Sequence, residues 1–208
     1  MRRDRYGNAK LYEIFIDPLM TDLRAVGMKM WPPRQGMLVL DVGCGTGAHL
    51  DLYQKARCES FGIDLSPAML KVAKKKLHDR ANLHMGDASQ MPYRDRTFDL
   101  VVLSMALHQV PSAIRSAEIK ESKRILKKNG RILVIDYHPG PMPFPEGWFY
   151  RILIFFIELF AGFEHFKNYW DFLTRGGFPP LSAKHELYTE KEKIVAKGNV
   201  GVFLLRLE

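Results

Sequence analysis

The chain has 208 residues, which is enough for one domain with a substantial core, and its 47% hydrophobic and 26% charged residues are typical of a globular protein. The formal net charge is +8, and no apolar run of the signal-peptide type follows the N-terminus. Its two cysteines, Cys44 and Cys58, form neither a disulfide framework nor a zinc motif. We therefore expect a protein of the reducing cytoplasm without a metal site.

The positive charge is dispersed rather than held in one tract. Its largest clusters fall at helical spacing and comprise Lys71, Lys74, Lys75, Lys76 and Arg80, then Lys120, Lys123, Arg124, Lys127, Lys128 and Arg131. Solvated helix faces explain them best, because cations are favourable near a helix C-terminus. An anionic membrane surface, an acidic substrate and nucleic acid remain as alternatives.

The first 36 residues suggest a helical extension that ends at Trp31-Pro32-Pro33. Strands and helices then alternate up to about residue 138, which predicts a parallel sheet. Ser66-Pro67 is a strong helix start, and a helix over Ser112–Lys128 should be closed by Asn129-Gly130. The five strands expected here are Met37–Val42, Glu59–Asp64, Asn82–Met85, Phe98–Ser104 and Arg131–Tyr137.

A helical insertion over residues 139–178 should follow the fifth strand. It opens with a proline-rich breaker, continues with the very apolar residues 148–163, and ends with a short helix over Phe166–Arg175. Arg151 and Glu158 interrupt the apolar run and share one helix face, so a membrane span is not indicated. We expect a lid over an apolar acceptor, with core packing and a peripheral membrane contact as alternatives.

Two further strands, Ser182–Tyr188 and Val200–Leu207, should complete the sheet. The link between them is too short for a helical crossover, so they should pair antiparallel. The whole chain then reads as a single α/β domain, with helices on both faces of a seven-stranded sheet.

The residues from Leu38 to Leu50 hold the most informative motif. A buried strand leads into a turn with three alternating glycines, Gly43, Gly45 and Gly47, and a helix begins directly after it. Such glycines allow positive φ and a close approach of the backbone to a ligand, and the helix N-terminus favours negative charge. This predicts a nucleotide-like or carboxylate-bearing ligand. The spacing Gly43-x-Gly45-x-x-Ala48 also matches a dinucleotide fingerprint.

Asp64 ends the second strand, 23 residues after Asp41. A carboxylate at this place can accept hydrogen bonds from both hydroxyls of a ribose. An acid here is equally expected of a nicotinamide-dependent enzyme, so it indicates a nucleoside without naming the cofactor.

The run Leu40-Asp41-Val42-Gly43-Cys44-Gly45-Thr46-Gly47 resembles the first motif of class I S-adenosylmethionine-dependent methyltransferases, and Gly86-Asp87-Ala88 matches their turn after the third strand. The motifs cover residues 37–138, and residues 182–208 agree in layout only. The resemblance implies a Rossmann-like sheet of order 3-2-1-4-5-7-6 with strand 7 antiparallel. It also implies S-adenosylmethionine as cofactor, bound by Asp41, Gly43, Cys44, Gly45, Gly47, Asp64, Leu65, Gly86, Asp87, Ala88, Ser104 and Met105.

Within this family, the small-molecule enzymes are the most similar, above all the ubiquinone and menaquinone C-methyltransferases and the membrane-associated thiol methyltransferases. Ser104-Met105-Ala106-Leu107 departs from the Asn-Pro-Pro-Tyr of amide methyltransferases. The resemblance therefore implies in-line transfer to a small, apolar acceptor beneath a lid that includes Trp148, Phe155, Phe156 and Phe160.

A general base is required only if the acceptor must lose a proton. His108 and His138 are the candidates, because both follow strand ends where ligands of open α/β sheets bind. Asp136 and Tyr137 lie beside the second of them, and His165 in the lid is a weaker candidate.

Three other functions remain open. An NAD-dependent oxidoreductase would share the glycine turn and Asp64, but the Gly86-Asp87 turn and the terminal antiparallel strands argue against it. An RNA methyltransferase would fit the dispersed basic residues, although no RNA-binding appendage is visible. A non-catalytic cofactor-binding protein is the third, because methyl transfer requires no diagnostic side chain.

Overall fold

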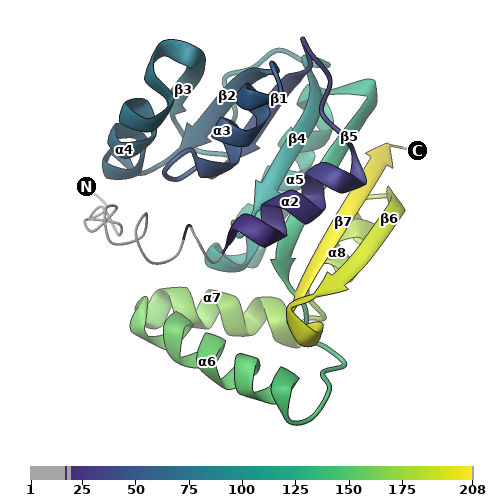
Figure 1. The fold of residues 1–208 in the computed structure, drawn as a ribbon. Helices are drawn as coiled ribbons and strands as arrows, with labels where there is room; N and C mark the ends of the chain where they lie inside the picture. The colour runs from purple at the N-terminus through teal and green to yellow at the C-terminus, as the bar shows by residue number, and fades with distance from the viewer. Residues whose placement is uncertain (1–16, 18–19, 208) are drawn as a thin grey trace.

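The computed structural model describes residue 17 and residues 20–207 (Figure 1). Seven strands form one sheet of order β3-β2-β1-β4-β5-β7-β6, as predicted. Strands β1 to β5 pair in parallel, and β7 is antiparallel to both β5 and β6. The strands are β1 (Leu38–Val42), β2 (Glu59–Asp64), β3 (Ala81–Met85), β4 (Phe98–Ser104), β5 (Leu126–Tyr137), β6 (Leu187–Val195) and β7 (Val200–Leu207).

Helices cover both faces of this sheet. In Figure 1, α2 (Thr21–Met30) lies in front of the sheet and α5 (Ser112–Ile125) lies behind it. Gly27 allows α2 to approach the sheet closely, because a Cβ at this position would lie 2.8 Å from the side chain of Leu133 in β5. The other helices are α3 (Ala48–Lys55), α4 (Pro67–Leu77), α6 (Glu146–Phe160), α7 (Phe163–Thr174) and α8 (Pro179–Lys184), with 3-10 turns η2 (His78–Arg80), η3 (Leu107–Gln109) and η4 (Ala196–Gly198).

The central strands are buried on both faces, which is why their sequences are nearly continuous apolar runs. In β4, Leu100 to Leu103 are each at most 1% exposed, and Ile132 to Ile135 of β5 are equally buried. This core fixes the carboxyl ends of β1, β2, β4 and β5 at one edge of the sheet, where α6 and α7 lie (Figure 1).

Two predicted boundaries were wrong. The helix expected to reach Lys128 ends at Ile125, and β5 begins at Leu126, which is buried and pairs with Phe98 of β4. Asn129-Gly130 is therefore not a helix cap. Gly130 lies where the β4–β5 register shifts, and a Cβ there would meet the carbonyl oxygen of Asp99 at 2.9 Å.

The sixth strand was also misplaced. Residues from Pro179 to Lys184 form a helix that begins with two prolines, and the strand starts only at Leu187. Its exposed run Tyr188–Ile194 is rich in lysine and glutamate, a composition that protects the edge of a sheet and resembles a loop in sequence.

Half of the predicted N-terminal extension lies outside the described residues, and its described half contains α2. The predicted insertion contains α6 and α7, as two helices packed against each other. Among residues 20–207, every helix is too short or too polar to cross a bilayer.

Candidate cofactor and acceptor site

The glycine turn has the backbone that its sequence predicts. Gly43, Gly45 and Gly47 have φ angles of +70°, +51° and +75°. The N–H groups of Gly43 and Cys44 donate to the carbonyl oxygen of Ile63 at 2.8 and 3.1 Å, which joins the turn to β2. A Cβ on Gly47 would lie 2.7 Å from Leu77, so a larger residue would separate α3 from α4.

Asp64 ties the end of β2 to the same turn. Its Oδ2 accepts a hydrogen bond from the Gly45 N–H at 2.8 Å, and its Oδ1 accepts from the Ser66 N–H at 2.8 Å. These two bonds orient the carboxylate toward the glycine turn. Asp64 therefore lies beside the glycine turn.

Asp41 is a buried acid below the turn, only 2% exposed. Burial raises its pKa to about 7, with further upward contributions from Asp64 and Asp17 and a downward one from Arg24. Its Oδ1 has no hydrogen-bond partner among the described residues. A buried carboxylate oxygen without a hydrogen bond costs free energy unless a ligand pairs with it.

The described part of the N-terminal segment reaches this turn through Asp17, which is 6% exposed. Its Oδ2 accepts a short hydrogen bond from the Thr46 hydroxyl and lies 3.3 Å from Lys76 Nζ. Its Oδ1 accepts from Arg24 at 2.7 Å. Three side chains thus hold Asp17 beside the glycine turn, a contact that sequence reasoning did not predict.

Apolar side chains are exposed beside Asp64. Leu65 is 58% exposed and Met85, which pairs with Asp64 across β2 and β3, is 69% exposed. The Gly86 N–H donates to the Asp64 carbonyl oxygen at 3.1 Å, and exposed Asp87 accepts from the Ser89 N–H at 2.8 Å. This edge offers an apolar surface and an acid to a planar base, and neighbouring Ala88 packs toward the core.

The turn after β4 meets the glycine turn. Ser104 ends the strand, and Met105 follows with φ +54° and an N–H that donates to the Ile135 carbonyl oxygen at 2.7 Å. A Cβ on Gly43 would lie 3.3 Å from that of Ala106. The predicted residues therefore converge at one edge, whereas the Cys44 side chain is buried, with its Sγ 2.8 Å from a Cβ built on Gly62.

His108 is 2% exposed and belongs to a buried polar cluster. Its Nδ1 lies 2.7 Å from Asp136 Oδ1, and Asp136 Oδ2 accepts from the backbone N–H groups of Leu107 and His108. Burial alone would lower the pKa of His108, but the carboxylates of Asp136 and Glu158 outweigh it and raise that pKa. Asp136 was expected beside His138, so its pairing with His108 revises that expectation.

Glu158 is the other acid of this cluster. Its Oε1 accepts from the Tyr137 hydroxyl at 2.7 Å, and its Oε2 lies 2.5 Å from His165 Nε2 and 3.8 Å from His108 Nε2. Burial would raise the pKa of Glu158, but His165, His108 and Tyr137 outweigh it and lower that pKa. One sign of this buried acid is visible in the sequence, because Glu158 is the one acidic residue in the apolar run 148–163.

His138 has a different environment. The Gly140 N–H donates to its Nδ1 at 3.2 Å, and its carbonyl oxygen accepts from Arg151 of α6 at 2.5 Å. The ring thus supports the loop before α6, and the catalytic role expected of His138 stays a prediction.

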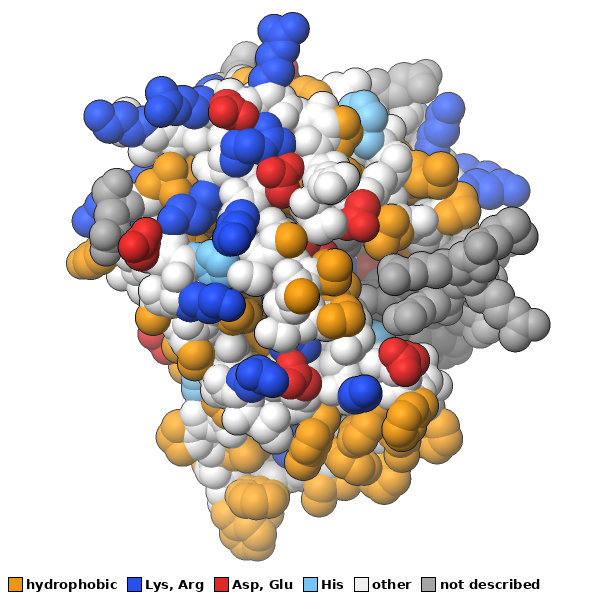
Figure 2. Space-filling view, turned by 180° about the vertical axis from the view of Figure 1, so that it is seen from behind, with side chains coloured by type: hydrophobic (Ala, Val, Ile, Leu, Met, Phe, Trp, Pro, Cys, Tyr) orange, Lys and Arg blue, Asp and Glu red, His pale blue; other side chains and the backbone are white. Residues whose placement is uncertain are grey.

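The apolar side chains of α6 point mostly outward, while Arg151 and Glu158 point inward. Trp148, Phe156 and Phe160 are 52%, 49% and 86% exposed. Phe155 is half-buried and packs against Phe166 of α7 with ring centroids 5.0 Å apart. In Figure 2, hydrophobic side chains cover the lower end of the molecule, where Figure 1 places α6 and α7.

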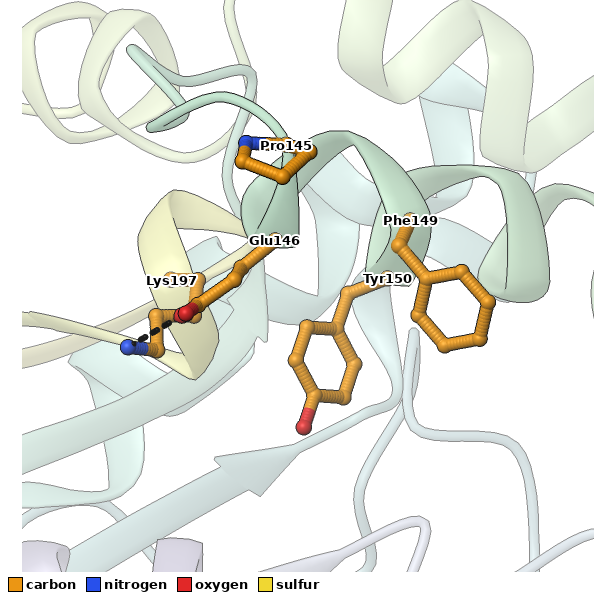
Figure 3. Close-up of a pocket in the computed structure, with 5 residues that line it drawn as sticks. All are labelled: Pro145, Glu146, Phe149, Tyr150 and Lys197. Carbon is orange, nitrogen blue, oxygen red and sulfur yellow. Dashed lines mark ion pairs between the residues drawn. The ribbon is translucent and has the colours of Figure 1, made fainter.

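A cavity opens at the start of α6, lined by Pro145, Glu146, Phe149, Tyr150 and Lys197 (Figure 3). Glu146 and Lys197 form an ion pair of 2.6 Å across it. It includes none of the predicted cofactor or catalytic residues, so it is distinct from the edge at which they meet.

Comparison with known proteins agrees with this geometry. Residues 40–134 match the family described as a methyltransferase domain. The demethylmenaquinone methyltransferase of Staphylococcus aureus is 31% identical over 157 residues, which cover 73% of this chain and 64% of the relative. The chain thus spans less than two thirds of the length of that relative.

Solved structures share the whole fold. A SAM-dependent methyltransferase from Aquifex aeolicus superposes with a TM-score of 0.69 at 18% identity, over 96% of this chain and 99% of that one. The Burkholderia thailandensis 1,6-didemethyltoxoflavin-N1-methyltransferase, solved with its substrate and S-adenosylhomocysteine, gives a TM-score of 0.64 at 13% identity, over 92% and 79% of the chains.

The sheet order and the glycine turn define the class I S-adenosylmethionine-dependent methyltransferase fold. Within that class, residues 40–134 are similar to the methyltransferase-domain family. The cofactor of this class is S-adenosylmethionine.

Proposed function

We propose that the protein transfers a methyl group from S-adenosylmethionine to a small apolar acceptor. The observation that carries the proposal is the convergence of the glycine turn, Asp64 and the orphaned Asp41 oxygen at one sheet edge. The antiparallel β7 and the methyltransferase-domain match argue against the NAD-dependent alternative.

The residues around this edge fit the parts of the cofactor. Asp64 would accept from the ribose hydroxyls, and Leu65 with the Gly86-Asp87-Ala88 turn would hold the adenine. Asp41 and the backbone of Gly43, Cys44, Gly45, Gly47, Ser104 and Met105 would surround the methionine part.

When bound, S-adenosylmethionine supplies a methyl group that is already activated on a sulfonium sulfur. The protein then has mainly to hold the acceptor in line with it, and such positioning can supply a large part of the rate acceleration. If the acceptor carries a proton, we propose His108 as its receiver. Asp136 holds the Nδ1 side of the ring at 2.7 Å, which directs Nε2 away from the sheet.

Two observations support a lipophilic acceptor. The Staphylococcus aureus relative is named for demethylmenaquinone, an apolar quinone. The outward face of α6 exposes aromatic side chains, including Trp148, Tyr150 and Phe156, on a chain with a net charge of +8. We propose that this face contacts an anionic membrane in which the acceptor is dissolved.

The test is methyl transfer from radiolabelled S-adenosylmethionine to a panel of demethylated quinols, phenols and lipophilic thiols. Label should enter the organic phase for at least one acceptor, and more so when anionic vesicles carry it. Label found only in added RNA would favour the RNA methyltransferase alternative. Tight cofactor binding without transfer to any acceptor of the panel would favour a non-catalytic role.

A further inference from the structure

The strongest unassigned feature is the cluster of His108, Glu158 and His165. Each contributes one potential ligand atom, and the three atoms lie within 4.8 Å of one another. Their side chains are 2%, 6% and 12% exposed. They come from three elements, η3, α6 and α7, which the fold brings together.

We propose that these three side chains bind one divalent transition-metal ion, with Zn²⁺ as the best match. Two imidazoles and one carboxylate, with a position left open, form a donor set that Zn²⁺ uses in proteins. Mg²⁺ prefers an all-oxygen shell and fits the imidazoles poorly.

The Glu158 carboxylate is the second, independent observation. Its Oε2 is buried and makes no well-directed hydrogen bond, although it lies 2.5 Å from His165 Nε2. A buried carboxylate oxygen without a well-directed hydrogen bond is costly. An ion between Oε2 and the two imidazole nitrogens would remove that cost.

The distances require only a small adjustment. Tetrahedral bonds of about 2.1 Å separate ligand atoms by about 3.4 Å. Glu158 Oε2 lies 3.8 Å from His108 Nε2 and 2.5 Å from His165 Nε2, so both of these distances are within one ångström of that separation, and the ligand atoms of the two histidines lie within 4.8 Å of each other.

The side chains that hydrogen-bond to the proposed ligands resemble those of known metal centres, where a carboxylate often accepts from the second nitrogen of a ligating histidine. Asp136 does so for His108 at 2.7 Å, and the Tyr137 hydroxyl fixes the other oxygen of Glu158 at 2.7 Å. The position of His165 is supported separately, because Arg115 donates to the Leu107 carbonyl oxygen and to Asp171 of α7 at 2.8 Å each.

An ion at this place would join both helices of the insertion to the turn after β4. It would also occupy the Nε2 lone pair of His108, so metal binding and proton uptake at that nitrogen exclude each other. The proposal does not rest on the proposed function, because metal binding is measured without cofactor or acceptor.

The experiment uses the untagged full chain after treatment with a chelator. Zn²⁺ titrated in a calorimeter should bind with one equivalent, and Co²⁺ should give a visible absorption band that Zn²⁺ abolishes and excess Mg²⁺ does not. Zn²⁺ should also raise the melting temperature. Failure of the wild-type chain to bind Zn²⁺ saturably overturns the proposal without reference to any variant.

Variants then locate the site. Tyr137→Phe should weaken Zn²⁺ binding by roughly 10- to 100-fold, and His165→Gln, which removes a ligand, should weaken it more. The control is His84→Gln, an exposed histidine on β3, which should bind as the wild type does. Unchanged stoichiometry and affinity in folded His165→Gln would overturn the proposal and leave the cluster as an internal ion-pair network.

Discussion

Replacement of Asp64 tests the cofactor site at its centre. In Asp64→Ala, the ribose would lose its charged acceptor. Hydrogen bonds to charged groups justify a loss of roughly 1–3 kcal/mol in cofactor binding, which is about a 5- to 150-fold rise in Kd. Calorimetric titration with S-adenosylhomocysteine measures this directly, because the demethylated product is not consumed.

The same carboxylate also holds the glycine turn, so some loss of stability is expected. The Gly45 and Ser66 N–H groups would lose their acceptors, at a cost of about 1 kcal/mol each. For a chain of this size that corresponds to a fall of roughly 4–8 °C in Tm. Titrations should therefore be made well below the melting point of the variant.

Two comparisons separate these effects. Asp64→Asn keeps one carbonyl acceptor and should lie between the wild type and Asp64→Ala in cofactor affinity. Asp95→Ala removes an aspartate that is 72% exposed and paired with Arg124 at the surface, and should bind like the wild type. If folded Asp64→Ala binds S-adenosylhomocysteine with unchanged affinity, Asp64 is not the ribose acid.

Three further predictions concern other residues. Because burial raises the pKa of Asp41 to about 7 from 3.8, the folded chain loses stability as the pH rises from about 4 to 7. Asp41→Asn should therefore raise the free energy of unfolding at pH 8 by up to roughly 4 kcal/mol, and the Tm with it, while it weakens cofactor binding. An unchanged or lower Tm would contradict the account of Asp41 as a buried acid. Phe156→Ala should change Tm little and should reduce sedimentation with anionic vesicles. Phe155→Ala should lower Tm more, because the Phe155 ring packs against α7. Equal vesicle binding by wild type and Phe156→Ala would refute the membrane contact. Asp136→Asn should reduce methyl transfer to an acceptor that loses a proton by roughly 10²- to 10⁴-fold, with a shifted pH profile, and full activity at every pH would exclude proton uptake by His108.

The central sheet and the cofactor edge could be predicted from sequence because short-range patterns determine them. The strand, glycine turn and helix around Gly45 require only local backbone rules, and the structure has positive φ at all three turn glycines. The strand order came from the family resemblance and is confirmed. These features need no knowledge of which side chains meet across the fold.

The predictions that failed depend on contacts between segments that are distant in the sequence. Gly130 suggested a helix cap, but the pairing of Leu126 with Phe98 extends β5 through it. The outward direction of the aromatic side chains on α6 was hidden because an almost wholly apolar helix does not reveal which face is buried. Two of its three charged residues, Arg151 and Glu158, mark the buried face, because they point inward to His138 and Tyr137.

The partners of His108 could not be inferred for the same reason. Glu158 and His165 lie about 50 residues from it and were assigned to a lid rather than to a polar cluster. Only the packing of α7 against η3 and of α6 against α7 brings them within reach. The fastening of Asp17 to Thr46 is likewise a contact between distant segments without a sequence motif.

The central claim is that the glycine turn and Asp64 bind S-adenosylmethionine. Its most direct test is a calorimetric titration of the full chain with S-adenosylhomocysteine and, separately, with NAD. The account predicts one saturable site for S-adenosylhomocysteine, a matching rise in melting temperature, and no heat or thermal shift with NAD. Saturable binding of NAD without binding of S-adenosylhomocysteine would contradict it.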